Sequence, residues 1–321
     1  MPSHLSALTT VSLPRLAVLV GKGGVGRSTM AAAMGLVASR RGHRCLIVEV
    51  SANPVIPGIF GVAGLGYRPA ACVPNLWTHR VGWEDALREY GLMKLKVRAL
   101  YRLVFENPFM RRLMPAIPGI SEILVIGKIL HSVTDGLPGI GVPDIVILDA
   151  PATGHGISLL TAPSVVESSV PSGPMADDAK KLRSMLLDRT FTRFHIVTTP
   201  EEMPVAESEE LFEEFSTRQG FPMGQILVNQ VRERILRPAQ REQLATALRR
   251  IQGSQAACAD VSGALFMADR AEVQRAYIQR LRNRVPLPLI ELPDAAGGRS
   301  IRERVEVLSS HLDAHLWREA R

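Results

Sequence analysis

The 321-residue chain is 46% hydrophobic, which is enough for one sizeable α/β core, and nothing marks a clean split into two independent domains. Its apolar runs stay far below the roughly 18 residues of a membrane-spanning helix, so we expect no integral membrane segment. The net charge of +7 comes from scattered basic residues and only 5% of the residues are aromatic, so nucleic acid is not expected as a partner. The first residues lack the pattern of a secretory signal, and we expect a cytoplasmic protein.

The chain opens with a pattern of strand, loop, helix and strand. Residues 16–20 form a short apolar, β-branched run that predicts a strand, and the alanine-rich residues 28–39 predict a helix that ends at Gly42. A glycine loop joins the two, and residues 44–50 supply a second apolar run. Strands joined through a helix run parallel in one sheet, so this unit predicts a parallel sheet.

The next part of the chain breaks this pattern. Residues 52–76 are rich in proline and glycine and predict a passage dominated by loops. Residues 83–130 predict several helices in succession. We therefore expect one domain over residues 1–321, with a helical insertion at residues 83–132.

Strands and helices alternate again in the second half. Apolar runs predict four further strands, at residues 144–148, 194–198, 225–228 and 287–292. Helical patterns lie between them, at residues 200–218, 238–251 and 269–284. The alternation predicts an α/β fold with a doubly wound, mostly parallel sheet. In such a sheet the ligand lies beyond the carboxyl ends of the strands, where the polar residues that follow these strands should converge.

The glycine loop reads GKGGVGRST and fits the phosphate-loop pattern G-x-x-x-x-G-K-[ST], except that Arg27 stands in place of lysine. The backbone N–H groups of such a loop turn inward, and the following helix adds positive partial charge, which suits phosphate. Ser28 is the expected Mg²⁺ ligand. A guanidinium is wider than an ammonium, which argues against ATP hydrolysis. It can also pair bidentately with phosphate oxygens, so Arg27 by itself does not exclude hydrolysis. The expected nucleotide-binding residues of the loop are Gly21, Gly23, Gly24, Val25, Gly26, Arg27, Ser28 and Thr29.

Five segments carry a family resemblance. They are Lys22 in KGGVG, PGISE at residues 118–122, DAPATGH at residues 149–155, VNQ at residues 228–230 and LPDAAGG at residues 292–298. Together they resemble the ArsA-like ATPases, the arsenite-pump and tail-anchored-protein-targeting family of deviant Walker A P-loop proteins in the SIMIBI class.

The resemblance implies a role for each matching residue. Lys22 would cross a dimer to the partner's nucleotide, in the role of an arginine finger. Asp149 would hold the Mg²⁺ shell, and the turn at residues 153–155 would sense the γ-phosphate. Asn229 would recognise adenine, and Pro293 lies in the loop that would cover it. The implied cofactors are ATP and Mg²⁺, and the implied partner is a second copy or a paralogue. From the residues alone, Asp149 could instead cap a turn, and Asn229 could be a C-cap or turn residue.

Two departures from the family pattern concern the chemistry. The family carries an aspartate that positions the attacking water after the second strand, and Ser51 stands in that place. A serine cannot act as a carboxylate base, and Glu49, on the same face by strand alternation, is the candidate substitute. Residues 231–243 contain no cysteine, so neither a zinc-bridged dimer nor a cysteine-built arsenite site is implied.

The insertion is unusually apolar, and two interpretations of it stay open. Its apolar residues could line a groove for a hydrophobic protein client, as in the relatives, or they could pack as core. They are Leu92, Met93, Leu95, Leu100, Leu103, Val104, Phe105, Met110, Leu113 and Met114.

Three hypotheses for the function follow. The first is an ATPase that binds Mg-ATP and uses dimer closure as a switch for a client or partner protein. The second is a nucleotide-binding pseudo-ATPase, the regulatory subunit of a hetero-dimer with an active paralogue, which Arg27 and Ser51 favour. The third, a partitioning-type ATPase on nucleic acid, would require a concentrated basic surface that the scattered arginines do not supply.

Overall fold

The computed structural model describes residues 13–51, 53–63, 68–95, 119–170, 172–250, 255–295, 297 and 300–317. Within these ranges the strands are β1 (Leu16–Val20), β2 (Cys45–Glu49), β3 (Ala70–Val73), β4 (Leu76–Arg80), β5 (Ile145–Asp149), β6 (Thr192–Thr198), β7 (Met223–Val231) and β8 (Leu289–Pro293). They form one sheet in the order β3-β4-β2-β5-β1-β6-β7-β8. Only the edge strand β3 pairs antiparallel, with β4, so the expected mostly parallel α/β sheet is confirmed.

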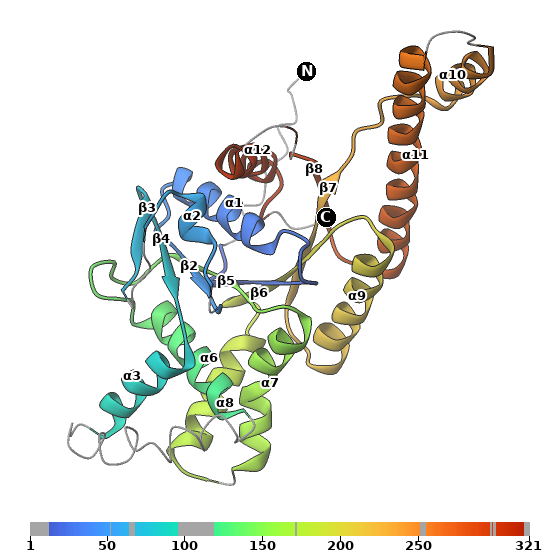
Figure 1. Ribbon diagram of the computed structural model, residues 1–321. Helices are drawn as coiled ribbons and strands as arrows, with labels where there is room; N and C mark the ends of the chain where they lie inside the picture. Colours follow the sequence, from blue (N-terminus) through green and yellow to red (C-terminus); the bar gives the residue numbers. More distant parts are fainter. Residues whose placement is uncertain are drawn as a thin grey trace, which may run out of the picture.

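The helices lie on both faces of this sheet. They are α1 (Arg27–Arg40), α2 (Ile56–Ile59), α3 (Trp83–Leu95), α6 (Ile120–Thr134), α7 (Thr153–Ser169), α8 (Pro174–Leu187), α9 (Glu202–Phe212), the π-helix η2 (Glu213–Arg218), α10 (Pro238–Arg250), α11 (Gln255–Arg284) and α12 (Ile301–Asp313). Figure 1 shows α1 and α12 over one face and α6, α7 and α8 over the other, while α10 and the far end of α11 project away from the sheet.

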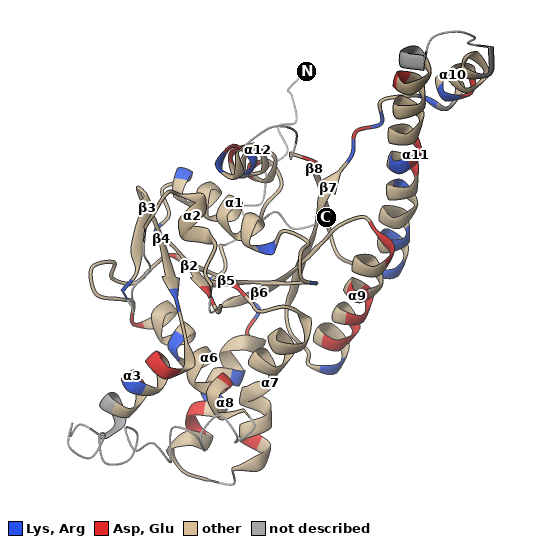
Figure 2. Ribbon diagram, in the orientation of Figure 1, with Lys and Arg blue, Asp and Glu red and all other residues tan. Residues whose placement is uncertain are grey.

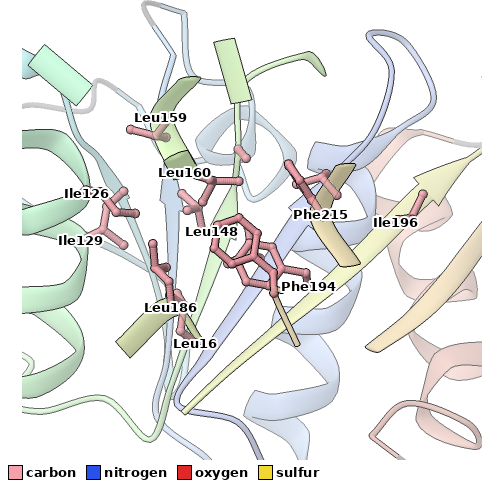
Figure 3. Close-up of a cluster of buried hydrophobic side chains, with 14 of the residues drawn as sticks. Leu16, Ile126, Ile129, Leu148, Leu159, Leu160, Leu186, Phe194, Ile196 and Phe215 are labelled. Carbon is pink, nitrogen blue, oxygen red and sulfur yellow. The ribbon is translucent and has the colours of Figure 1, made fainter. Parts of the chain in front are cut away.

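Two hydrophobic layers bury both faces of the sheet. Along β1, Leu16 and Val18 contribute to the layer that includes α6, α7 and α8, whereas Ala17 and Leu19 contribute to the layer under α1 and α12. Figure 3 shows the first of these clusters. Because successive side chains of a strand point to opposite faces, a strand covered on both sides is expected to be almost continuously apolar. This explains the continuous apolar runs from which these strands were predicted.

Three aromatic rings pack the π-helix against the sheet. The ring of Phe194 in β6 stacks on Phe221 at a centroid distance of 4.6 Å, and Phe215 of η2 meets both rings edge-on at 5.8 Å and 5.6 Å. Phe194 and Phe215 are fully buried. Such aromatic contacts add to the burial of apolar area, so η2 is held by packing at the end of α9.

The loop-dominated passage predicted at residues 52–76 is wrong in part, because it contains α2, β3 and the start of β4. β4 pairs parallel with β2 and extends the sheet. Its sequence did not predict a core strand because Thr78 and His79 are polar, although both side chains are buried. The helix α7 was not predicted because Pro163 lies in its interior. The helix predicted from residue 269 is also longer than expected, since α11 begins at Gln255.

The helical insertion is described only at its two ends, α3 and α6. Residues 96–118, which include most of the apolar residues assigned to a groove or a core, lie outside the described residues, so the insertion at 83–132 stays a prediction. In the described part of the chain, no helix combines the length and the apolar character needed to cross a membrane.

Candidate functional site

The carboxyl ends of β1, β2, β5 and β7 meet around the glycine loop. Glu49 at the end of β2 is the register partner of Asp149 at the end of β5, so the two carboxylates lie on the same face of the sheet. Asn229 near the end of β7 reaches the loop from the other side of β1 through Val25. The structure thus brings the predicted strand-end residues to one edge, on the face covered by α1.

The path of the loop depends on glycine at two positions. A Cβ atom on Gly21 would lie 2.2 Å from the carbonyl oxygen of Val197, a backbone atom that cannot move aside. Gly26 precedes α1 with φ of 93°, and its Cβ would lie 2.4 Å from Nδ2 of Asn229. L-residues with side chains rarely adopt this left-handed conformation. Glycine therefore allows the loop to lie close against β6 and β7.

Ser28 and Asp149 form the centre of the site. The Ser28 hydroxyl donates to Oδ2 of Asp149 at 2.5 Å. The other carboxylate oxygen, Oδ1, is buried, and no residue in the described ranges hydrogen-bonds to it. Burial raises the pKa of Asp149, and the Ser28 hydrogen bond and the charge of Arg27 oppose that rise. A buried carboxylate oxygen with no partner is suited to a cation or to a bound water.

These two residues fit a magnesium ion. Mg²⁺ prefers oxygen ligands and usually keeps several waters while it binds one or two protein groups and substrate phosphates. A serine hydroxyl beside a carboxylate with a spare oxygen supplies such groups. Among the described residues, no cluster of three or more His, Cys, Asp or Glu side chains offers a complete protein cage for a metal.

Arg27 ties the glycine loop to the segment after β5. Its Nη1 donates to the carbonyl oxygen of Pro151 at 2.6 Å and to that of Gly21 at 3.1 Å. Burial lowers the pKa of Arg27, and the negative charge of Asp149 partly offsets this. The guanidinium that replaces the usual phosphate-binding lysine is therefore engaged with backbone oxygens of the protein.

Lys22 is held by a residue that sequence analysis did not single out. Its Nζ forms an ion pair with Oε1 of Glu207 in α9 at 2.5 Å. The second carboxylate oxygen of Glu207 accepts a hydrogen bond from the Thr153 hydroxyl at 3.3 Å. The acidic stretch after Pro200 predicted a helix, but nothing in its composition indicated which of its glutamates would face the loop.

Glu49 and Ser51 have different hydrogen-bond partners. Glu49 is buried, and its carboxylate accepts the N–H groups of Val55 at 2.8 Å and of Ile56 at 3.2 Å at the start of α2. Burial raises the pKa of Glu49 to about 7, against those two hydrogen bonds. Ser51 is exposed in a turn with Asn53. Strand alternation does not extend to Ser51 because β2 ends at Glu49.

Asn229 fastens the glycine loop from the β7 side. Its Nδ2 donates to the carbonyl oxygen of Val25 at 2.9 Å, and its Oδ1 accepts the N–H of Gln230 at 2.9 Å. Both ends of the amide therefore bond to backbone groups. Pro293, the residue assigned to the adenine cover, ends β8 and is the register partner of Val231.

The predicted turn at residues 153–155 is the first turn of α7. Thr153 is half-buried against Glu207, whereas Gly154 and His155 are exposed. Asp149 lies four positions before this helix, and Arg27 donates a hydrogen bond to Pro151 in the short segment between them.

A strand, a glycine loop and a helix at the carboxyl edge of a parallel sheet, with a serine and an aspartate beside the loop, define a class of α/β proteins that bind nucleotides. The family described as Anion-transporting ATPase matches residues 15–172 and 173–269. The chain belongs to this family.

Curated relatives share this family. The ATPase BagA of Mycobacterium tuberculosis is 31% identical over 241 residues, which cover 71% of this chain and 66% of that protein, just under two thirds of its length. An ATPase ASNA1 homolog of Entamoeba dispar is 25% identical over 272 residues, covering 72% of this chain and 80% of that protein. The ATPase GET3C of Arabidopsis thaliana is 22% identical over 280 residues, covering 71% and 70%.

Proposed function

We propose that this protein is an ArsA-like ATPase that binds Mg-ATP at residues 21–29 and uses nucleotide-dependent dimer closure as a switch. The observation that carries the proposal is the pairing of Ser28 with Asp149 at 2.5 Å, with Oδ1 of Asp149 buried and unpaired in the described part of the chain. That pair lies directly beside a loop that has no space for a side chain at Gly21 or Gly26. Family membership supports nucleotide binding in general.

The proposal assigns a role to the loop, to Ser28 and Asp149, to Lys22 and to Thr153. The N–H groups of the loop and the first turn of α1 bind the phosphates. Magnesium, when bound, neutralises phosphate charge. Ser28 and Asp149 would hold the ion, and Lys22 would leave Glu207 to reach the nucleotide of a second copy or a paralogue. The Thr153 hydroxyl and α7 then pass the change to the helices that pack on α7.

A cavity in the helical layer supports the proposal of a hydrophobic client. A cavity of about 190 Å³ lies between α3, α6 and α8. Its wall is largely apolar, with Ile123 and Leu124 from α6 and Leu182 and Met185 from α8. Since α6 and α8 both pack against α7, a client in this cavity lies one helix away from Asp149. We propose that the protein works in the cytoplasm on such a client.

Single-turnover hydrolysis of Mg-ATP tests the proposal. Wild-type protein should bind and hydrolyse ATP, and Lys22→Ala should still bind but lose about 100-fold or more in rate, because it lacks the cation that stabilises the transition-state charge. Equal rates for the two proteins would contradict a catalytic role for Lys22. Absence of binding by the wild type would contradict the proposal as a whole.

A second candidate function is the pseudo-ATPase subunit of a hetero-dimer. Two observations favour it: Arg27 is engaged with backbone oxygens, and the Glu49 carboxylate is occupied by the N terminus of α2. In this case wild-type protein binds Mg-ATP without turnover, and the double variant Arg27→Lys with Ser51→Asp gains hydrolysis. Turnover by the unmodified chain alone would exclude this candidate.

A further inference from the structure

We propose that Glu207 is a positioning residue that holds Lys22 inside its own subunit and releases it when nucleotide and a partner subunit compete for it. This inference rests on the proposed function, in which Lys22 acts across a dimer. Glu207 is assigned this role because its two carboxylate oxygens contact two different elements of the site, Lys22 of the glycine loop and Thr153 of α7.

The two contacts belong to the parts of the site that respond to nucleotide. Lys22 is the second residue of the glycine loop, and Thr153 begins α7 four positions after Asp149. A carboxylate shared between them stabilises one relative placement of loop and helix. When Lys22 swings away, Glu207 loses its charged partner and, among the described residues, keeps the Thr153 hydroxyl at 3.3 Å, so the link between the loop and α7 is broken.

The helix that carries Glu207 is itself well fixed. Val205 and Leu211 of α9 are buried, and the neighbouring Glu209 accepts two hydrogen bonds from the Arg280 guanidinium of α11, at 2.7 Å and 2.8 Å. A bidentate pair of this kind sets geometry as well as charge. On the ribbon in Figure 2, the acidic positions of α9 lie beside basic positions of α11. Glu207 therefore stays in place, and Lys22 is the group that moves.

The strength of the contact suits a release. The side chains of Lys22 and Glu207 are 32% and 24% exposed, and partly exposed ion pairs contribute little to stability because water and salt compete for both charges. The phosphates of a bound nucleotide carry more charge than one carboxylate. The contact therefore holds Lys22 weakly enough to be broken. When the ion pair is removed, the equilibrium constant for dimer closure should rise by the factor that corresponds to the free energy of the pair.

Glu207→Gln tests the restraint, with Glu210→Gln as the matched control. Glu210 lies on the same helix and lines the same hollow as Glu207, but it is exposed. The first readout is acylation of Lys22 by a small amine-reactive ester, followed by mass spectrometry, with the exposed Lys180 as reference. The second is the concentration of Mg²⁺ with a non-hydrolysable ATP analogue that gives half-maximal dimer in sedimentation velocity.

In Glu207→Gln we expect Lys22 to label faster, by up to about fivefold relative to Lys180, and half-maximal dimer to need about that much less nucleotide. Glu210→Gln should match the wild type in both. Unchanged labelling of Lys22 in Glu207→Gln overturns the restraint, as does faster labelling with an unchanged nucleotide requirement. If labelling rises but neither protein dimerises at saturating nucleotide, the proposed dimer function fails, and the inference falls with it. Glu207→Asp, with a shorter carboxylate, should be intermediate and serves if the glutamine variant does not fold.

Discussion

The glycine loop and the helical layer on the opposite face of the sheet are built by different means. In the loop, the backbone determines the structure: Gly21 and Gly26 have no space for a side chain, and the polar side chains hydrogen-bond to each other or to carbonyl oxygens. In the layer of α6, α7, α8 and η2, packing of apolar side chains determines it. Substitutions in the loop should therefore change ligand binding most, whereas substitutions in the layer should change stability most.

The largest effect on stability is expected in the layer, at Phe215. Its ring is fully buried between Phe194 and Phe221, so Phe215→Ala leaves a cavity and should lower the free energy of unfolding by about 3–5 kcal/mol. Urea denaturation measures this. Phe266→Ala on α11, where the ring is 62% exposed, is the control and should stay within about 0.5 kcal/mol. The nucleotide affinity of folded Phe215→Ala should equal that of the wild type. A large loss of affinity would show that the helical layer also determines ligand binding.

In the loop, Gly26→Ala should act on binding more than on stability. The left-handed conformation and the contact with Asn229 make the change cost about 1–3 kcal/mol of strain, and the altered loop should no longer bind nucleotide tightly. Fluorescence titration with a labelled ATP analogue measures the affinity. Gly58→Ala in α2, where a Cβ meets open space, should bind as the wild type does. Tight binding by Gly26→Ala would show that the loop tolerates other conformations.

Glu49 should make stability depend on pH. Its pKa is raised by burial to about 7, whereas in the unfolded chain it is about 4.3. The folded protein therefore binds the proton more strongly, and the contribution of Glu49 is lost as pH rises from about 4.3 to 7. Because solvent screening weakens the effect, the contribution of Glu49 to the free energy of unfolding should fall by about 1 kcal/mol from pH 5 to pH 7. Buried His195, with its pKa lowered to about 4, acts in the opposite direction.

The contribution of Glu49 is measured as a difference because His195 titrates in the same range. Urea denaturation of wild type and Glu49→Gln at pH 5 and pH 7 gives that difference: from pH 5 to 7 the free energy of unfolding of the wild type should change less favourably than that of the variant, by about 1 kcal/mol. Parallel pH profiles for the two proteins would show that Glu49 has an ordinary pKa.

The smallest effect on stability is expected in the cavity of the helical layer. Gly127 of α6 lines it, and a Cβ there would lie 3.7 Å from Leu182, an ordinary contact. Gly127→Leu should fill the cavity and change stability by less than about 1 kcal/mol, since leucine favours the helix. Binding of an apolar fluorescent dye should fall, while ATP binding stays the same. Undiminished dye binding would place the apolar site elsewhere.

Much of the fold could be predicted from the sequence because strands buried on both faces are apolar throughout. This was the case for β1, and for β2 and β5 up to the acidic residue that ends each strand. The strand β4 could not be predicted in this way, because Thr78 and His79 are buried polar residues. The helix α7 was missed for another reason, because Pro163 interrupts the helical pattern. Local composition cannot indicate that neighbouring elements will cover a polar strand or hold a helix together across a proline.

The candidate site was predictable where spacing along the chain determines it. The loop residues and Asp149 are close because β1 and β5 are neighbours, and a strand-end pattern indicates this. Glu207 was missed because its contact with Lys22 joins residues far apart in the chain and depends on the rotation of α9. The partners of Arg27 were also hidden, since both are carbonyl oxygens that any residue could supply.

The central claim is that Ser28 and Asp149 hold magnesium beside a nucleotide in the glycine loop. Calorimetric titration of the protein with ATP, in Mg²⁺ and again in EDTA, tests it most directly, with Ser28→Ala and Asp149→Asn run alongside. We expect ATP to bind more tightly with Mg²⁺ than with EDTA, and both variants to lose that difference. Equal affinity with and without Mg²⁺ in the wild type, or an unchanged metal dependence in both variants, would contradict the claim.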